Sequence, residues 1–180
     1  MEISEGNKLS KALRDAIRDV PDFPKKGIIF KDITTVLNDA ELFKQSIDQL
    51  IDLVRDCNYT AVAAIESRGF IFGAALAYQM HLKFVPIRKP GKLPAKTISE
   101  EYKLEYGVDR IEIHSDALDK KDQVLLIDDL LATGGTARAS CTLIEKLGAH
   151  VQTILFLVEL EFLNGRNILA GHDVRSLVQY

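Results

Sequence analysis

Residues 124–136 read VLLIDDLLATGGT, and this stretch decides the fold class of the chain. Four apolar residues run directly into the acids Asp128 and Asp129, and a turn of small residues, 132–136, leads into a helix-like segment. A short apolar run of this kind is typical of a buried strand in a parallel sheet. The turn leaves backbone N–H groups uncovered at the start of a helix, where a phosphate group can approach them closely. The stretch therefore predicts a site for a ligand with a phosphate at one end and hydroxyl groups beside the two acids.

Strand-like and helix-like segments alternate along most of the chain. Runs that predict strands lie at residues 60–65, 82–87, 124–127, 151–160 and 174–180. Helical patterns lie at residues 8–20, 39–56, 70–80 and 136–147, with a short helix at 164–170. Asn38 and Asp39 are candidate N-cap residues, and Gly148 is placed to end a helix. The alternation predicts βαβ units, and hence an α/β fold with a mostly parallel, twisted sheet flanked by helices.

One part of the chain departs from this alternation. Residues 88–101 are predicted as a long polar loop, because they combine prolines, a glycine and many charges. Residues 102–106 and 110–114 are predicted as two short strands, and the residues between them, 107–109, favour a hairpin turn.

The composition bounds the function. A chain of 180 residues favours one domain spanning residues 1–180. The net charge of -3 argues against a partner that is nucleic acid, because phosphate-binding surfaces are usually basic. No apolar run approaches the roughly 20 residues that span a bilayer, and the first residues lack a signal-peptide pattern, so we expect a cytoplasmic protein that does not contact membranes. Two cysteines and four histidines without ligand spacing favour neither a disulfide framework nor a metal cluster.

Polar segments follow three of the predicted strands. They cover residues 66–69, 88–92 and 128–136. Because ligands of parallel sheets bind outside the carboxyl ends of the strands, we expect these segments to form a single site. The second segment begins a basic cluster of Arg88, Lys89, Lys92 and Lys96, which is suited to a small anion. Lys96 has an equally good interpretation as an ordinary solvated charge.

Several other classes share parts of the 124–136 pattern. The stretch lacks the lysine that follows the glycines of a nucleotide P-loop, and it lacks the pattern G-x-G-x-x-G. Two acids at a strand end are also typical of receiver domains, but those need a lysine after a late strand, and Lys146 falls in a predicted helix. A plain strand-to-helix turn with two solvated acids is the remaining structural alternative.

The stretch 124–136 resembles the phosphoribosyl-pyrophosphate (PRPP) binding motif of the type I phosphoribosyltransferases. Other stretches resemble the adenine phosphoribosyltransferase family within that group. Residues 21–33 are similar to its base-binding region, 66–70 (ESRGF) and 88–94 (RKPGKLP) to its pyrophosphate-side loops, and 104–107 (LEYG) to its mobile catalytic loop. The motifs occur in the family's order and cover nearly the whole chain.

The resemblance implies a fold and a reaction. The fold would be the Rossmann-like sheet of type I phosphoribosyltransferases, with a small base-binding hood from about residues 1–35 and a flexible β-hairpin loop. The reaction would join adenine to PRPP and give AMP and pyrophosphate, through a sugar that resembles an oxocarbenium ion. The resemblance also implies Mg²⁺, held mainly by PRPP and water rather than by the protein, and a homodimer. A relative that uses another purine base and a non-catalytic PRPP-binding regulator are the alternative functions.

The resemblance also implies a role for individual residues. The residues expected to serve catalysis are Arg68, Glu105, Asp128 and Asp129. The 5′-phosphate would be bound by Ala132, Thr133, Gly134, Gly135 and Thr136. The pyrophosphate would be bound by Ser67, Arg68, Arg88, Lys89 and Lys92, with Arg88 and Lys92 reaching the pyrophosphate of the partner subunit in the family's dimer. Adenine would be read by Ile29, Phe30 and Lys31, and Tyr106 would belong to the flexible loop.

Physical chemistry supports most of these roles. The two acids can accept hydrogen bonds from ribose hydroxyls, and their charge favours a sugar that turns cationic. Glu105 is placed as the acid–base group for the purine, although a solvated hairpin charge is the simpler interpretation from the residues alone. Arg68 has a structural alternative as a strand cap. Lys31 stands where the family often has arginine, and the resemblance also implies a cis peptide between Glu66 and Ser67.

Overall fold

The computed structural model describes residues 5–103 and 108–180. The chain divides into two compact units, Met1–Asp52 and Leu53–Tyr180. The single domain over residues 1–180 and its hood from about residues 1–35 stay predictions. None of the described helices combines the length and apolar character needed to cross a membrane.

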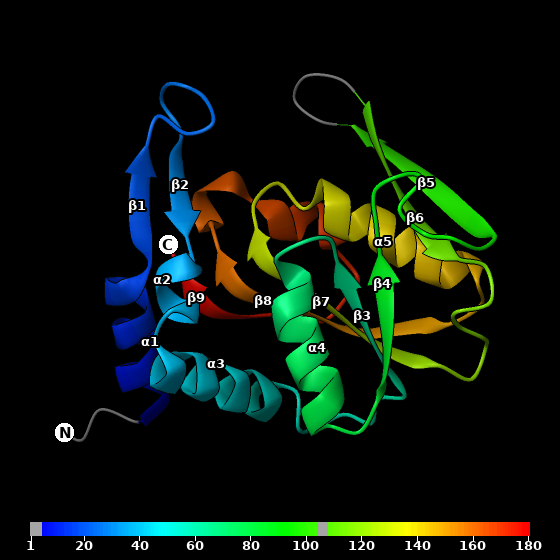
Figure 1. Ribbon diagram of the computed structural model, residues 1–180, viewed down its shortest axis with the longest axis horizontal. Coiled ribbons are helices and arrows are strands. Elements are labelled where there is room, and N and C mark those ends of the chain that lie inside the picture. The colour runs from blue at the N-terminus through cyan, green and yellow to red at the C-terminus, as the bar shows by residue number, and fades with distance from the viewer. Residues whose placement is uncertain (1–4, 104–107) are drawn as a thin grey trace. The chain divides into compact units, whose positions relative to one another are not determined.

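The first unit combines helices with a two-stranded antiparallel sheet. Its elements are α1 (Glu5–Ala16), β1 (Arg18–Pro21), β2 (Ile29–Asp32), α2 (Thr34–Leu37) and α3 (Ala40–Leu53) (Figure 1). The carboxylate of Asp39 accepts hydrogen bonds from the backbone N–H groups of Glu41 and Leu42, at 3.0 and 2.9 Å. Asp39 is therefore the helix N-cap that the sequence predicted.

The helix predicted over residues 8–20 ends earlier, at Ala16. The residues after it enter β1, where Arg18 lies opposite Asp32 of β2 and forms an ion pair with it at 2.5 Å. Helical periodicity within residues 8–20 carries no information about a partner fourteen residues away. Cross-strand pairing therefore overrides the local pattern at this helix end.

The second unit is built on a parallel sheet. Among the described residues, five strands lie in the order β4-β3-β7-β8-β9, and each pairs with its neighbours in parallel (Figure 1). The strands are β3 (Ala61–Ile65), β4 (Lys83–Ile87), β7 (Gln123–Leu131), β8 (His150–Glu159) and β9 (Val174–Gln179). The connecting helical elements are α4 (Gly69–Gln79), α5 (Gly135–Lys146), η1 (Glu161–Leu163) and η2 (Gly165–Leu169). This arrangement confirms the predicted α/β fold class.

Helices cover both faces of the sheet, which explains why β3 is buried along its whole length. On one face, the α-carbon of Gly73 in α4 lies against Ala64 and Ile127. On the other face, Ala63 belongs to the same core cluster as Cys141 of α5. The chain leaves β3 toward β4 and leaves β7 toward β8, in opposite directions across the sheet. The carboxyl ends of β3 and β7 therefore form a topological switch point, where ligands of such sheets bind.

Two strand boundaries differ from the prediction. β7 continues through both acids to Leu131, because its backbone keeps pairing with β8 beyond Ile127. The polar loop predicted over residues 88–101 is wrong from residue 97 onward, where β5 (Thr97–Lys103) pairs in antiparallel with β6 (Val108–His114), as expected of a hairpin. The turn predicted at residues 107–109 is wrong at Val108 and Asp109, which pair within β6, and residues 104–107 lie outside the described part of the chain. Ile98 and Tyr102 pack against the core, but the charged residues between them hide this alternation in the sequence.

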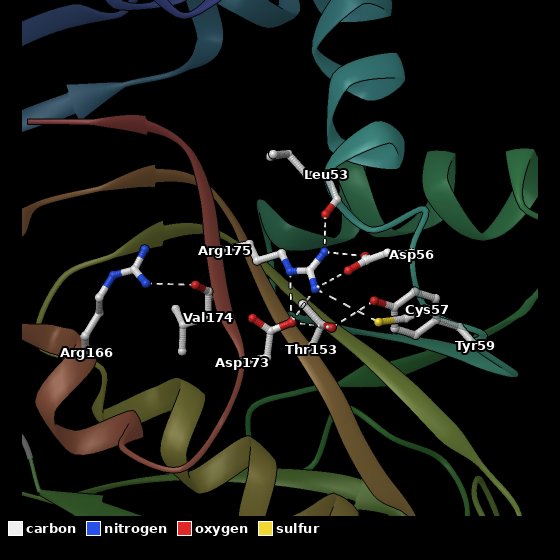
Figure 2. Close-up of polar contacts among 9 residues, drawn as sticks. All are labelled: Leu53, Asp56, Cys57, Tyr59, Thr153, Arg166, Asp173, Val174 and Arg175. Carbon is white, nitrogen blue, oxygen red and sulfur yellow. Dashed lines mark hydrogen bonds and ion pairs between the residues drawn. The ribbon is translucent and has the colours of Figure 1, made fainter. Parts of the chain in front are cut away.

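A cluster around Arg175 ties the start of β9 to the segment before β3 (Figure 2). The guanidinium donates to the carbonyl of Leu53 and to both carboxylate oxygens of Asp56, at 2.5 and 3.0 Å. It also pairs with Asp173 at 2.7 Å, and Asp173 in turn accepts from Thr153 of β8. The cluster lies at the amino ends of the strands, at the sheet edge opposite the switch point.

Candidate functional site

A cavity of about 240 Å³ lies at the carboxyl ends of β4, β3 and β7. Its lining consists of Ile65, Glu66, Ser67, Arg68, Ile87, Lys89, Tyr102, Ile111, Asp128, Asp129 and Thr136. The three segments predicted to converge, residues 66–69, 88–92 and 128–136, each contribute to it. Parallel pairing places those strand ends side by side, so segments far apart in sequence share one pocket.

Two adjacent carboxylates form the floor of this cavity. Asp129 is buried and forms an ion pair with Arg68, which comes from the turn between β3 and α4. Asp128 is half-buried and lines the cavity, and its Oδ1 accepts the backbone N–H of Asp129 at 2.9 Å. Burial raises the pKa of Asp128 well above its usual 3.8, and the neighbouring charge of Asp129 adds to the rise. A group with developing positive charge would favour the ionised form of this acid.

Gly69 is fitted to the acidic pair. A β-carbon at this position would lie 2.8 Å from Oδ1 of Asp128 and 3.2 Å from its α-carbon. The first residue of α4 must therefore lack a side chain for the helix to begin directly beside Asp128. This close approach explains the glycine in the sequence ESRGF.

A second cavity, of about 80 Å³, adjoins the acids at the start of α5. It is lined by Asp128, Leu130, Leu131, Ala132, Thr133, Gly134, Gly135, Thr136, Ala137 and Phe156. Gly134 precedes the helix with φ +83, and no side chain caps the first turn. Uncapped N–H groups at a helix N-terminus are suited to an anion such as phosphate. All five residues predicted to bind a 5′-phosphate line this cavity.

The turn before α5 is held by the 3₁₀ segment η2. A β-carbon at Gly165 would lie 2.2 Å from the carbonyl oxygen of Ala132. A β-carbon at Gly134 would lie 2.5 Å from the side chain of Ile168 and 2.6 Å from the carbonyl oxygen of Gly165. Arg166 anchors η2 by two hydrogen bonds, 2.6 and 2.7 Å, to the buried carboxylate of Glu159. None of these contacts was predicted, because each joins residues from separate segments of the chain.

The basic loop after β4 divides into residues that reach the pocket and residues that do not. Lys89 lines the cavity, whereas Arg88 and Lys92 are not among its lining residues. Arg88 instead binds Glu66, with nitrogen–oxygen distances of 3.0 and 3.3 Å, and donates to the carbonyl of Lys92 at 3.1 Å. The peptide between Glu66 and Ser67 is cis, as the resemblance implied.

Lys89 contacts two groups of the β5–β6 hairpin. Its ammonium forms an ion pair with Asp109 and lies 3.1 Å from the hydroxyl oxygen of Tyr102. Burial lowers the pKa of Lys89, but the hydrogen bonds with Asp109 and Tyr102 outweigh it and leave the pKa raised. Neither Tyr102 nor Asp109 was a predicted site residue, although the period-two spacing of Ile98 and Tyr102 could have indicated an inward face.

The residues predicted to read adenine all lie in β2, within the first unit. Ile29 is 55% exposed, and the ring of Phe30 meets that of Phe23 edge to face, with centroids 5.2 Å apart. Lys31 forms an ion pair with Asp19 at 2.6 Å. Glu105 and Tyr106 lie outside the described residues.

The described residues contain no group of three or more histidine, cysteine, aspartate or glutamate side chains that could hold a metal ion. The cavity does offer the carboxylate oxygens of Asp128 and Asp129, with hydroxyl groups of Ser67 and Thr136. Hard oxygen donors of this type are compatible with Mg²⁺ when the substrate and water supply the other ligands.

Comparison with known proteins gives a consistent result. The family described as "Phosphoribosyl transferase domain" matches residues 34–161. Adenine phosphoribosyltransferase of Thermotoga neapolitana is 53% identical over 168 residues, which cover 93% of this chain and 99% of that protein. The enzyme of that name from Caldanaerobacter subterraneus is 55% identical over 168 residues, which cover 93% of this chain and 97% of that protein.

Solved structures show the same similarity in three dimensions. The crystal structure of adenine phosphoribosyltransferase from Thermoanaerobacter pseudethanolicus matches with a TM-score of 0.94 and 53% identity, covering 95% of this chain and 99% of that one. The Saccharomyces cerevisiae enzyme, crystallised with an imino-altritol bisphosphate and adenine, matches with a TM-score of 0.89 and 36% identity, covering 94% and 98%.

Proposed function

Because this chain belongs to the adenine phosphoribosyltransferase family, we propose how its residues divide the work of that family's reaction. The protein is a pentosyltransferase that transfers the phosphoribosyl group of PRPP to adenine, giving AMP and pyrophosphate in purine salvage. One observation carries the assignment of residues. The paired acids Asp128 and Asp129 lie between an uncapped helix N-terminus and the cations Arg68 and Lys89.

This spacing matches the three parts of PRPP. The 5′-phosphate would accept hydrogen bonds from the backbone N–H groups of residues 132–136 and from the hydroxyls of Thr133 and Thr136. The ribose would then lie over Asp128 and Asp129, which accept hydrogen bonds from its hydroxyls. The pyrophosphate would extend toward Arg68 and Lys89, with Ser67 beside it.

Bond breaking at the sugar uses these same groups. N9 of adenine displaces pyrophosphate at C1′, and positive charge develops on the ribose as the leaving group departs. The carboxylates of Asp128 and Asp129 are fixed in place before that charge appears, so they stabilise it without reorganisation. Arg68 would move from Asp129 toward the departing pyrophosphate, whose negative charge grows in the same step.

We infer a supporting role for Mg²⁺. The ion would be held mainly by PRPP oxygens and water, with the oxygen donors of Asp128 and Asp129 nearby. When bound, it would neutralise part of the charge on pyrophosphate. Arg68 and Lys89 would neutralise the remaining negative charge of pyrophosphate.

The assignments for the base remain proposals drawn from the family. Ile29 and Lys31 would read the adenine edge through their backbone groups, and Phe30 would stack on the ring. The pairing of the Lys31 side chain with Asp19 supports a main-chain role for this residue. Glu105 would exchange a proton with the imidazole nitrogens of the purine, and Tyr106 would lie in the same loop.

Arg88 and Lys92 are proposed to serve the pyrophosphate end less directly. The contact between Arg88 and Glu66 supports a role in shaping the loop that presents Lys89.

A homodimer is also proposed, and apolar residues on the outer side of α4 support it, since Ile71 is 39% and Tyr78 is 82% exposed. Sedimentation of the protein and of Tyr78→Glu would test that surface. A cytoplasmic location stays a prediction.

One assay tests the function. The protein is incubated with PRPP, Mg²⁺ and either adenine, hypoxanthine or guanine, and pyrophosphate release is followed. We expect turnover with adenine and far less with the other bases. Turnover of hypoxanthine without adenine would indicate a different purine specificity, and tight PRPP binding without turnover of any base would indicate a regulator.

A further inference from the structure

The ammonium of Lys89, a residue that lines the cavity, already has an anionic partner on the β5–β6 hairpin. Its Nζ forms an ion pair with Oδ2 of Asp109, and the hydroxyl of Tyr102 donates to the same oxygen at 3.0 Å. The Tyr102 ring lies 5.6 Å from the ammonium, close enough for a cation–π contact. Asp109 therefore already makes with Lys89 the type of contact that a phosphate oxygen would make.

The neighbouring pair of Glu66 and Arg88 differs from this one. Glu66 also accepts the backbone N–H of Lys89, at 3.0 Å, so the pair is part of the loop's own fold. Asp109 comes from the separate β5–β6 hairpin and meets Lys89 only through side chains. Its other oxygen accepts the N–H of Arg110 at 2.8 Å, which keeps the carboxylate on the hairpin. Lys89 can therefore leave Asp109 without breaking any backbone pairing.

The strength of the pair suits an exchange of partners. The side chain of Lys89 is 42% exposed and that of Asp109 is 30% exposed, so solvent screens their attraction. A pyrophosphate group carries several charges and accepts several hydrogen bonds, which makes it the stronger partner for an ammonium. Replacing Asp109 by pyrophosphate at the ammonium is favourable. The free energy lost when Lys89 leaves Asp109 nevertheless reduces the affinity of the protein for pyrophosphate.

We propose that Asp109 is a resident counter-ion of Lys89 that the pyrophosphate group displaces, and that it thereby weakens the hold of the enzyme on PRPP and on product pyrophosphate. The proposal rests on the proposed function, because it takes Lys89 as a ligand of pyrophosphate. Asp109 is a positioning residue in this scheme, since it acts through Lys89 and not on the reacting atoms.

The test compares Asp109→Asn with Glu101→Gln, which removes one negative charge from the same hairpin. Glu101 pairs with the exposed Arg110 of the same hairpin, whereas Asp109 pairs with Lys89. Calorimetry measures Kd for pyrophosphate with Mg²⁺ and for PRPP, and steady-state assays measure KM for adenine. We expect Asp109→Asn to lower both Kd values roughly two- to fivefold, the range set by partly exposed ion pairs, with KM for adenine unchanged. Asp109→Glu, which keeps a carboxylate, should return toward the parent values.

The same measurements in a Lys89→Met background identify the partner through which Asp109 acts. The effect of Asp109→Asn should disappear there, because the counter-ion no longer has an ammonium to hold. The proposal is overturned if Asp109→Asn binds pyrophosphate and PRPP more weakly than the parent protein does. It is also overturned if Glu101→Gln raises these affinities equally, or if Asp109→Asn still raises them in the Lys89→Met background. Failure of the parent protein to turn over adenine while it binds pyrophosphate would instead contradict the proposed function and leave this inference standing.

Discussion

Gly165 and Ala132 are in direct backbone contact, and a β-carbon on Gly165 would lie 2.2 Å from the carbonyl oxygen of Ala132. The contact joins η2, near the end of the chain, to the turn at residues 132–136, which is proposed to bind the 5′-phosphate. Gly134 also packs against η2, close to the carbonyl oxygen of Gly165. The turn at residues 132–136 and η2 therefore approach closely where each has a glycine. The shape of the turn at residues 132–136 therefore depends on η2, which does not line the second cavity.

Replacing Gly165 by alanine should widen the turn at residues 132–136 and weaken phosphate binding. The added methyl group must push Ala132 away, at a cost of about 1–3 kcal/mol, and we expect Kd for AMP to rise about tenfold. Calorimetry with AMP gives the affinity and thermal denaturation gives the stability. Gly171→Ala is the control, because it introduces strain at φ +94 but meets no atom within 4 Å. Equal losses of AMP affinity in both variants would contradict the claim that η2 sets the shape of the turn at residues 132–136.

Asp129→Asn should slow catalysis more than it weakens the binding of AMP. The amide still accepts a ribose hydrogen bond but no longer offers a negative charge to the developing cation. We expect kcat to fall on the order of 10²-fold, with a much smaller change in Kd for AMP. Single-turnover and binding measurements separate the two quantities, and the exposed Asp116→Asn is the control. Parallel losses in both quantities would mean that the acid only positions the sugar.

Asp128→Asn should stabilise the protein at neutral pH. Burial and the Asp129 charge raise the folded-state pKa of Asp128, so the folded state binds this proton more tightly than the unfolded state does. The acid therefore destabilises the fold progressively as pH rises from about 3.8, its usual value, through the raised pKa. Urea denaturation from pH 4 to pH 8 should show a gain for the variant that grows with pH. A gain independent of pH would point to packing and not to charge.

Arg175→Lys should lower stability and leave catalysis unchanged. A lysine keeps the charge but cannot donate at once to Asp56, Asp173 and the carbonyl of Leu53. Because both acids are well exposed, we expect a loss of only about 1–2 kcal/mol in the free energy of unfolding. Lys44→Met, which removes an exposed ion pair with Asp48, is the control and should leave the free energy of unfolding nearly unchanged. A change in kcat would contradict the prediction, because it would mean that this edge of the sheet influences the site at the opposite edge.

The sequence predicted the parts of the site that lie on single segments. Asp128 and Asp129 lie near the end of β7 and residues 132–136 follow it, and strand alternation placed residues 66–69 beside them. The role of Glu159 could not be predicted in this way, because its buried carboxylate depends on Arg166 and Ser176 from other segments. Tyr102 was missed because charged neighbours concealed the inward face of β5. Pairings between distant segments carry this information, and a local pattern does not contain it.

Helix α5 begins without a side-chain cap of its own, because Gly134 stands at that position. In the proposed site, a bound 5′-phosphate would accept the hydrogen bonds that no side chain takes here, so PRPP and AMP would complete the start of this helix. Binding restricted to the folded state adds about 2.7 kcal/mol of stability when the ligand is a hundredfold above its Kd. We therefore expect the lifetime of the folded protein, against heat and proteases, to follow the supply of its own metabolites.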